Sequence, residues 1–500
     1  MSAELLKLGA DVLVEPLTWI INQSITSGKF PSQWKEAKIS PLHKKGDRQI
    51  LKNYRPVSLL PVAGMVLENV VKTQLEQYFK ENKLLQEFQF GFRRNKSTIS
   101  ELLTVFDKLF KGKEEGREIS LLLFDLSAAF DTIDHSLLLT KLEIYGCDQH
   151  SIRWFKSYLK DRVQRVNVNG ELSDSIKINR GTPQGSRLSP LLFIILMADL
   201  NLHIKDVDHC HLSNFADDTQ LTTIEETEEK AIEKTQEEAR AIIAFFEGVK
   251  LCNNADKAAL LWNSKGKHKD MEMEVGGEVL KSKENEKLLG VVINSNLDWT
   301  THVEKLCSTL KQRISLLHRI KHKINKQKME MMVDAIFTSK FRYGIAVYSI
   351  PKYEFNHMEQ PMDPNISKLQ VVQNDLLRML IGHSRQSQTN MQKLREEMKI
   401  MSVNQISCYH VAIEMFNIIV NGSSKSLQDE FKLEQRGYPL RSLEDGQVKV
   451  PQKAKKSCTG FSYTGPKLWN YLPSEIRTTD DRDEFKAKIK SWIWTNIPSI

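Results

Sequence analysis

The chain has 500 residues, too many for one ordinary hydrophobic core, and its 40% hydrophobic and 27% charged residues are typical of a globular protein. No apolar run approaches the roughly 20 residues of a membrane-spanning helix, and the N-terminus lacks the basic and apolar regions of an export signal. The 6 cysteines never stand at C-x-x-C spacing, so their pattern indicates neither a zinc site nor a disulfide framework.

The N-terminal part of the chain predicts helices around one short strand. Apolar residues at helical spacing predict a helical segment that ends at the breaker SGKFPS, residues 27–32. Residues 34–47, WKEAKISPLHKKGD, predict a short strand and a basic turn closed by Gly46. The segment NYRPVSLLP, residues 53–61, is expected to be a loop that leads into a long amphipathic helix.

The middle of the chain alternates predicted strands and helices. The apolar run Ile119–Phe124 predicts a strand buried on both faces, and helical patterns follow it. The pair Asn169-Gly170 predicts a hairpin. An apolar helix at residues 189–204 precedes the extended stretch SNFADDTQLTT, residues 213–223, and an acidic helix follows at 224–248. This order predicts an α+β fold, with an antiparallel sheet covered by helices on one side.

Charge is distributed unevenly along the chain, whose net charge is +8. Residues 301–350 hold ten lysines and arginines against three acidic residues, whereas the helix at 224–248 is acidic. A basic helix is often only a solvated face. Segregation of positive charge into one region nevertheless favours a nucleic-acid partner. Beyond residue 353 the pattern weakens, and residues 359–365, EQPMDPN, predict a linker.

Two adjacent aspartates, Asp217 and Asp218, lie inside an otherwise strand-like stretch. Aspartate is common in turns, so a plain turn is the simpler interpretation. A metal site is the alternative, because adjacent carboxylates repel each other unless a cation neutralises them. Asp125 ends the buried strand and could face this pair, although a surface aspartate at a strand end is again the simpler reading. Three such carboxylates would suit two Mg²⁺ ions about 4 Å apart, which support phosphoryl transfer.

The motifs LLLFDLSAAFDTIDH, GTPQGSRLSPLLF and FADDTQL, in this order, resemble the palm motifs of reverse transcriptases. The flanking segments WKEAKISPLHKKGD, NYRPVSLLP, FQFGFRRNKST and WFKSYLKDRVQRVNVNG resemble those of non-LTR (LINE-type, jockey-like) retrotransposons, as does the tail FSYTGPKLWNYLPSEIR. The resemblance implies a right-hand polymerase with fingers, an antiparallel palm sheet and a helical thumb. It divides the chain into an N-terminal helical extension (1–36), fingers and palm (37–298), a basic helical thumb (299–355) and a mainly helical C-terminal region of unknown role (356–500).

The resemblance also implies an activity, RNA-directed DNA polymerisation by two-metal-ion phosphoryl transfer, as in target-primed retrotransposition. Asp125, Asp217 and Asp218 would be both the catalytic residues and the ligands of two Mg²⁺ ions, with Mn²⁺ as a possible substitute. Asp217 is expected to be the indispensable one of the adjacent pair. The partners would be an RNA template, a DNA primer or target and deoxynucleotides, without a membrane, in the nucleus or the cytoplasm.

Further residues match the nucleotide-binding positions of the family. Phe130 matches an aromatic steric gate, Gln184 and Gly185 match a motif along the nucleotide and template, and Lys257 could protonate departing pyrophosphate. Fingers residues that bind the triphosphate are matched by Arg55 together with Lys44 or Lys45. Each has a simpler alternative: a core aromatic, an ordinary proline turn, or solvated basic side chains.

Two other functions are compatible with the same motifs. One is a catalytically silent nucleic-acid-binding remnant of a retroelement, and the other is a group II intron-type maturase. Intact Asp125, Asp217 and Asp218 argue against the first, although Ala128 departs from the basic residue that the family often has there. No endonuclease is apparent ahead of the fingers. We therefore expect that activity from a missing N-terminal domain or another protein.

Overall fold

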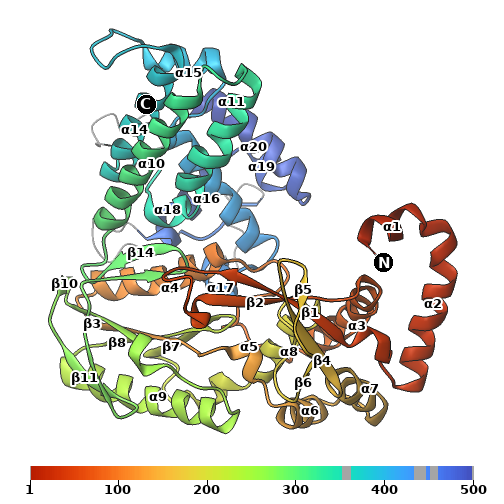
Figure 1. The fold of residues 1–500 in the computed structure, drawn as a ribbon. Helices are drawn as coiled ribbons and strands as arrows, with labels where there is room; N and C mark the ends of the chain where they lie inside the picture. The colour runs from red at the N-terminus through yellow and green to blue at the C-terminus, as the bar shows by residue number, and fades with distance from the viewer. Residues whose placement is uncertain (1, 352–361, 433–445, 451–459, 498–500) are drawn as a thin grey trace.

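The computed structural model describes residues 2–351, 362–432, 446–450 and 460–497. Two sheets lie side by side, a helical lobe stands above them, and two N-terminal helices project at one edge (Figure 1). These N-terminal helices are α1 (Ala3–Leu8) and α2 (Ala10–Ser27), so the predicted helical segment is confirmed, with a break at Gly9. Within the described residues, no helix is both long and apolar enough to cross a membrane.

The first sheet, called here the outer sheet, has the order β2-β1-β4-β5, with β6 also paired to β4. Its strands are β1 (Glu36–His43), β2 (Tyr54–Leu59), β4 (Arg162–Val168), β5 (Glu171–Leu172) and β6 (Ile176–Ile178). β1 and β4 are parallel, whereas the other pairs are antiparallel. The strand before Gly46 and the hairpin at Asn169-Gly170 are thus confirmed.

The expectation of a loop at residues 53–61 is wrong, because most of this segment is strand β2. Proline lacks the N–H that a strand donates, which makes Pro56 a poor indicator of a strand. β2 is an edge strand, where such a residue is tolerated, and Pro56 lies opposite Pro41 of β1. The sequence alone could not reveal this pairing, since it depends on the neighbouring strand.

The second sheet, called here the central sheet, is entirely antiparallel with the order β10-β9-β3-β8-β7. Its strands are β3 (Glu118–Phe124), β7 (Cys210–Phe215), β8 (Asp218–Glu225), β9 (Ala259–Ser264) and β10 (Lys267–His268). β3 is the middle strand and is buried along nearly its whole length, as predicted from its apolar run. Two small hairpins follow, β11 (Glu272–Val275) with β12 (Glu278–Lys281), and β13 (Asn285–Leu288) with β14 (Val291–Asn294).

Helices cover both faces of the central sheet, so the expectation of helices on one side only is wrong. Helix α4 (Thr98–Glu114) packs on one face, where Ile119 of β3 lies close to Gly112. Helix α9 (Glu228–Gly248) packs on the other face, where Ser120 of β3 is hydrogen-bonded to Thr235. Successive side chains of a strand point to opposite faces, so an apolar run such as β3 requires a cover on each.

The remaining helices of this part of the chain connect the two sheets. They are α3 (Val62–Glu81), α5 (Ala129–Thr132), α6 (His135–Ile144), α7 (Gln149–Leu159) and α8 (Ser189–Leu196). Helix α8 is buried on nearly every side, as its continuous apolar sequence predicted. Buried side chains of these helices and of α9 form one core. Helices α6, α7 and α9 lie below the sheets in the view of Figure 1.

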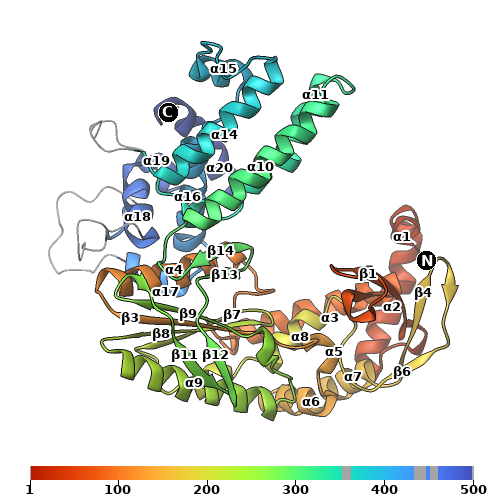
Figure 2. The same ribbon diagram turned by 60° about the vertical axis from the view of Figure 1, so that its left-hand side comes forward.

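The helical lobe stands above the central sheet, and its two long helices α10 and α14 lie side by side (Figure 2). Its principal helices are α10 (Thr300–Ile320), α11 (Lys326–Met332), α14 (Pro364–Ile381), α16 (Val403–Ile419), α17 (Lys425–Phe431), α18 (Phe461–Tyr471) and α20 (Arg482–Asn496). The basic helices predicted after residue 300 are confirmed. The expected linker at 359–365 lies partly outside the described residues, and its last two residues open α14.

One hydrophobic core joins α10 to the C-terminal helices and to α4 of the central sheet. Polar contacts add to it: the Ser462 backbone N–H donates to Asp107 Oδ1 at 3.1 Å, and Lys111 Nζ lies 2.6 Å from Asp107 Oδ2. Lys111 also pairs with Glu430 of α17. The C-terminal helices and α10 therefore share a core, and the division of the chain at residue 355 stays a prediction.

Candidate active site

The adjacent aspartates lie at a tight turn between β7 and β8. Phe215 pairs with Asp218, which leaves only Ala216 and Asp217 as loop residues. Ala216 has a φ of +60°, and a positive φ at the first of two loop residues is typical of a type II′ hairpin turn. The turn interpretation and the metal-site interpretation are thus compatible, because the turn itself presents the two carboxylates.

Asp125 follows β3 directly and lies beside this turn. The β3–β8 register ends with Phe124 opposite Thr219, so the next residue of each strand is Asp125 and Asp218. Directly opposite residues of antiparallel strands have Cβ atoms about 4.5–5.5 Å apart and point to the same face. That face is the one covered by α4, since Leu123 and Ile224 both pack into the core on that side. The fold thus brings the three predicted aspartates together.

The three carboxylates repel one another electrostatically. Burial and the charges of Asp217 and Asp125 raise the pKa of Asp218 to about 6. Burial also raises the pKa of Asp217, with Asp125 adding to the effect and Arg55 and Lys44 opposing it. Carboxylates that disfavour their own ionisation in this way form a donor set that a divalent cation would stabilise. The residues therefore fit the expected metal ions.

Lys257 approaches this site more closely than its sequence position suggested. It lies in the short helical turn after α9, and its Nζ is 2.8 Å from Asp125 Oδ2. Both side chains are substantially exposed, so the ion pair is screened by water and weak. The pairing places a proton donor next to the carboxylates, which is the position that the expected role of Lys257 requires.

The segment FQFGF, residues 88–92, holds the turn in place. Gln89 Oε1 accepts hydrogen bonds from the backbone N–H groups of Gly91 and Ala216, at 2.8 and 3.0 Å. A Cβ on Gly91 would lie 2.3 Å from the Ala216 nitrogen, so only glycine permits this approach. Gln89 is almost completely buried. The FQFGF motif was the signal that could have identified these residues.

The TPQG segment connects α5, which follows Asp125, to the outer sheet. The Ser58 N–H of β2 donates to the Gln184 carbonyl at 2.7 Å, and Gln184 Nε2 donates to Asp131 Oδ2 at 2.7 Å. Gly185 has a φ of +131°, and a Cβ there would lie 2.5 Å from the Ser58 carbonyl oxygen. Glycine is therefore required at this position both for its conformation and for space.

Phe130 lies in α5, one turn after Asp125, and its ring is half-buried. The ring centroid is 4.9 Å from that of the buried Phe193 and 6.1 Å from that of the exposed Phe92. Its backbone carbonyl accepts a hydrogen bond from Thr182 of the TPQG segment. Phe130 thus has one packed side and one more open side, and both the steric-gate and the core interpretation remain compatible with its position.

The basic residues of the outer sheet differ in their relation to the aspartates. Arg55 lies on β2 opposite Leu42, and Lys44 follows the end of β1. The positive charges of these two residues offset part of the rise in the pKa of Asp217, and Lys44 has the same effect on the raised pKa of Asp131. Lys45 is an exposed residue of the same turn. Lys44 is therefore better placed than Lys45 for a ligand at the aspartates, and a role for Lys45 stays a prediction.

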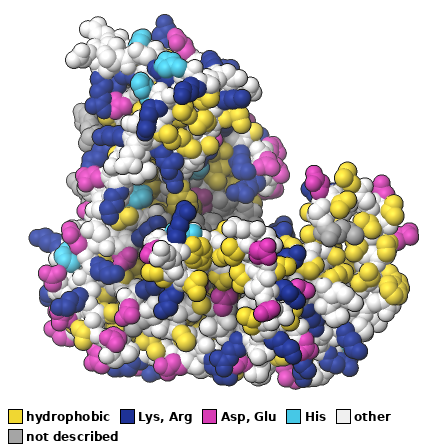
Figure 3. All heavy atoms as spheres, in the orientation of Figure 1, with side chains coloured by type: hydrophobic (Ala, Val, Ile, Leu, Met, Phe, Trp, Pro, Cys, Tyr) yellow, Lys and Arg dark blue, Asp and Glu magenta, His cyan; other side chains and the backbone are white. Residues whose placement is uncertain are grey.

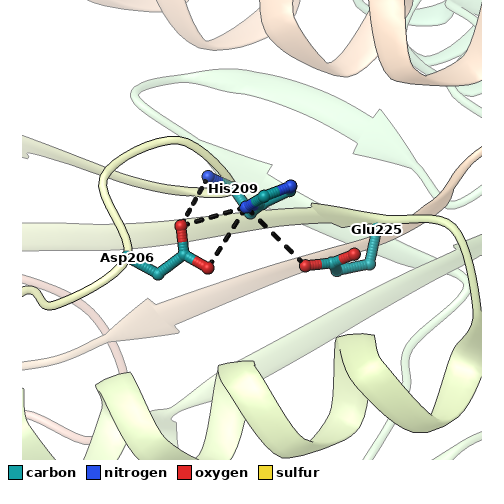
Figure 4. A group of neighbouring side chains, drawn as sticks. All are labelled: Asp206, His209 and Glu225. Atoms are coloured by element: carbon teal, nitrogen blue, oxygen red, sulfur yellow. Dashed lines mark hydrogen bonds and ion pairs between the residues drawn. The ribbon is translucent and has the colours of Figure 1, made fainter.

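A second group of potential metal ligands lies at the opposite end of β7 and β8. Within the described residues, Asp206, His209 and Glu225 are the group of three whose ligand atoms lie within 4.8 Å of one another. His209 Nδ1 is 3.0 Å from Asp206 Oδ1 and 3.9 Å from Glu225 Oε1 (Figure 4). The ammonium group of Lys234 pairs with both carboxylates. A lysine thus already offsets part of the negative charge of this cluster.

The family profile described as "Reverse transcriptase (RNA-dependent DNA polymerase)" matches residues 42–293, which are just over half of the chain and include all three palm motifs. The chain belongs to the reverse transcriptase family. Asp125, Asp217 and Asp218 lie within the matched range, as do Gln89 and Gly185. The motif-based identification is thereby confirmed.

Two relatives support the resemblance to jockey-like elements. The RNA-directed DNA polymerase from mobile element jockey of Drosophila melanogaster is 26% identical over 75% of this chain and 41% of its own length. The probable RNA-directed DNA polymerase from transposon BS of the same species is 26% identical over 73% of this chain and 40% of its own length. The chain thus spans about two fifths of these relatives. The reverse transcriptase resembles those of jockey-like non-LTR elements, as predicted.

Among solved structures, two Candida telomerases align with much of this chain at low sequence identity. The telomerase of Candida tropicalis with a fragment of telomeric RNA aligns over 80% of this chain and 64% of that chain, at 13% identity and a TM-score of 0.40. The Candida albicans enzyme aligns over 76% of this chain and 65% of that chain, at 12% identity and a TM-score of 0.40.

Proposed function

We propose that this chain is an RNA-directed DNA polymerase that adds deoxynucleotides to a primer 3′-OH on an RNA template, as in target-primed retrotransposition. The observation that carries the proposal is the position of Asp125, Asp217 and Asp218 at one end of the central sheet. Burial, together with the repulsion among these carboxylates, raises the pKa values of Asp217 and Asp218 and so favours bound cations.

The three aspartates would hold two Mg²⁺ ions, or Mn²⁺ in their place. When bound, such ions stabilise the attacking and leaving oxygens of an in-line displacement at phosphorus. Asp217 offers its carboxylate from the turn, and Asp218 and Asp125 offer theirs from neighbouring strands. Lys257 then exchanges its contact with Asp125 for the departing pyrophosphate and donates a proton to it.

The nucleotide would lie between the aspartates and the outer sheet. Arg55 and Lys44, with Lys45 beyond them, supply positive groups for the triphosphate oxygens. Gly185 permits close approach of the backbone to the base pair, and Gln184 offers amide groups beside it. Phe130 packs under the deoxyribose and leaves no room for a 2′-OH.

The template and primer would lie between the sheets and the helical lobe. The surface is hollowed between the lobe and the N-terminal helices, and lysine and arginine side chains gather on the lobe (Figure 3). We assign the central sheet to the palm, the outer sheet to the fingers, and α10 with α11 to the thumb. The proposed site of action is the nucleus or cytoplasm, and an endonuclease would come from a further domain or another protein.

Primer extension on an RNA template tests this function. The wild type is expected to incorporate deoxynucleotides with Mg²⁺, and Asp217→Asn to lose incorporation while it still folds and keeps its duplex affinity. Asp208→Asn is a matched control, because Asp208 is an exposed aspartate near the start of β7, at the other end of the hairpin. A wild type that binds duplex yet extends no primer with Mg²⁺ or Mn²⁺ would instead support a silent remnant.

A further inference from the structure

A buried carboxyl group lies directly behind the turn that carries the catalytic aspartates. Glu101 belongs to the first turn of α4, and its side chain is completely buried. Its Oε1 accepts two hydrogen bonds, from Ser213 Oγ at 2.8 Å and from Gln220 Nε2 at 2.5 Å. Ser213 belongs to β7 and Gln220 to β8, so one carboxyl oxygen joins both strands of the catalytic hairpin.

The two donors are a matched pair in the register of this hairpin. Ser213 lies directly opposite Gln220. Ser213 comes two residues before Phe215 on β7, and Gln220 comes two residues after Asp218 on β8. Side chains two residues apart on a strand point to the same face. Gln220 and Asp218 thus both point toward α4, and a shift of Gln220 along or out of the sheet would move Asp218 with it.

The environment of Glu101 favours its neutral form. Its Oε2 is buried and has no hydrogen-bond partner among the described residues. Burial raises the pKa of Glu101 to about 8, with a further contribution from the negative charge of Asp218. A neutral carboxyl group still accepts both hydrogen bonds through Oε1. It also adds no fourth negative charge behind the three aspartates.

We propose that Glu101 is a positioning residue of the polymerase site, which holds the catalytic hairpin through Ser213 and Gln220 so that Asp218 faces Asp125. The proposal rests on the proposed function for its activity readout. It differs from that function because Glu101 touches neither substrate nor metal and acts only through the two strands. Gln89 holds the same turn from its other side through the Ala216 N–H.

Glu101→Gln and Glu101→Leu separate positioning from simple core packing. Glutamine keeps an acceptor oxygen for both donors and carries no charge, so it mimics the neutral acid. Leucine fills the space but leaves the Ser213 hydroxyl and the Gln220 amide without an acceptor. Glu118→Leu is the matched control, because Glu118 is almost as buried at the other end of β3 and accepts one hydrogen bond from Ser264. Its Oε2, like that of Glu101, has no hydrogen-bond partner in the part of the chain that the structure describes.

Three quantities should be measured for each variant: kcat for primer extension at saturating Mg²⁺, KM for deoxynucleotide, and the rise in melting temperature that Mg²⁺ causes. Glu101→Gln is expected to keep kcat within about threefold of wild type. A displacement on the order of 1 Å in an active site costs about 100-fold in rate, so Glu101→Leu is expected to lose kcat on that scale. It should also lose most of the Mg²⁺-induced stabilisation, whereas Glu118→Leu keeps both.

Equal losses of kcat in Glu101→Leu and Glu118→Leu would overturn the proposal, because they would reflect general destabilisation only. Loss of kcat in Glu101→Gln as large as in Glu101→Leu would also overturn it. Should Glu101→Leu fail to fold, Ser213→Ala removes one donor and should give a smaller loss of kcat, whereas unchanged kcat would refute the proposal. A wild type without polymerase activity would refute the proposed function, and the Mg²⁺-induced stabilisation would still test Glu101.

Discussion

Replacing Asp218 with asparagine should stabilise the metal-free protein while it impairs catalysis. Asparagine keeps the shape of the side chain and removes a charge that is disfavoured by burial and by the charges of Asp217 and Asp125. A carboxyl pKa raised from 3.8 to about 6 corresponds to about 3 kcal/mol at pH 7 as an upper bound. Although its surroundings desolvate the carboxylate, part of the Asp218 side chain still contacts solvent, so screening reduces the expected gain to about 1 kcal/mol.

The pH dependence of this gain follows from linkage. The folded protein binds the Asp218 proton more tightly than the unfolded chain does, so wild-type stability falls as the pH rises from 3.8 to about 6. The asparagine variant has no such proton. The excess of its free energy of unfolding over that of the wild type should therefore be small at about pH 4.5, grow toward pH 6, and stay constant above that value. Millimolar Mg²⁺ should reduce this excess, because a cation stabilises the wild-type carboxylate.

Thermal unfolding between pH 4.5 and 7.5, with and without Mg²⁺, measures the effect. A gain of about 1 kcal/mol corresponds to about 1 to 2 °C in a chain of this size. Asp208→Asn serves as the control, because Asp208 is exposed and lies at the other end of the hairpin. An Asp218→Asn protein that is less stable than wild type at pH 7 without Mg²⁺ would refute the electrostatic account of this site.

Three further changes test the surroundings of the aspartates. Gly185→Ala should cost about 1 to 3 kcal/mol of stability and most activity, because the new Cβ clashes with Ser58. Gly170→Ala is the control, since Gly170 also has a positive φ but open space around it; it should lose less stability in the same melting assay and retain activity. Phe130→Val should improve ribonucleotide use about 10- to 200-fold relative to deoxynucleotides, and an unchanged kcat/KM ratio would indicate a core role. Three exposed lysines of the basic helical segment can be replaced with glutamine: Lys323, Lys326 and Lys328. The triple variant should flatten the slope of log K against log salt for duplex binding by up to roughly 2 to 3, and an unchanged slope would mean that the segment is only a solvated face. Lys321 of the same segment is left unchanged in this variant, because its Nζ donates a hydrogen bond to the Met379 carbonyl.

The sequence by itself pointed to the chemistry proposed for this protein. Asp125, Asp217 and Asp218 stood out as carboxylates beside apolar strands, although a turn or a surface position was the simpler interpretation of each. The resemblance of the motifs around them to reverse transcriptases then assigned them a catalytic role. The strand Ile119–Phe124, the hairpin at Asn169-Gly170 and the basic helices were also predictable. Each depends on side-chain periodicity or turn preference within a few neighbouring residues, which the linear sequence displays directly.

Only the tertiary structure decided which residues support that chemistry. The strand β2 escaped prediction because an edge position tolerates Pro56, and the second helical cover of the central sheet comes from α4, far from α9 in sequence. Gln89 and Glu101 accept hydrogen bonds from the β7–β8 hairpin across more than 100 residues of chain. Their polar side chains resemble ordinary surface residues in the sequence. Burial and hydrogen-bond partners, which arise only from long-range packing, give them their roles.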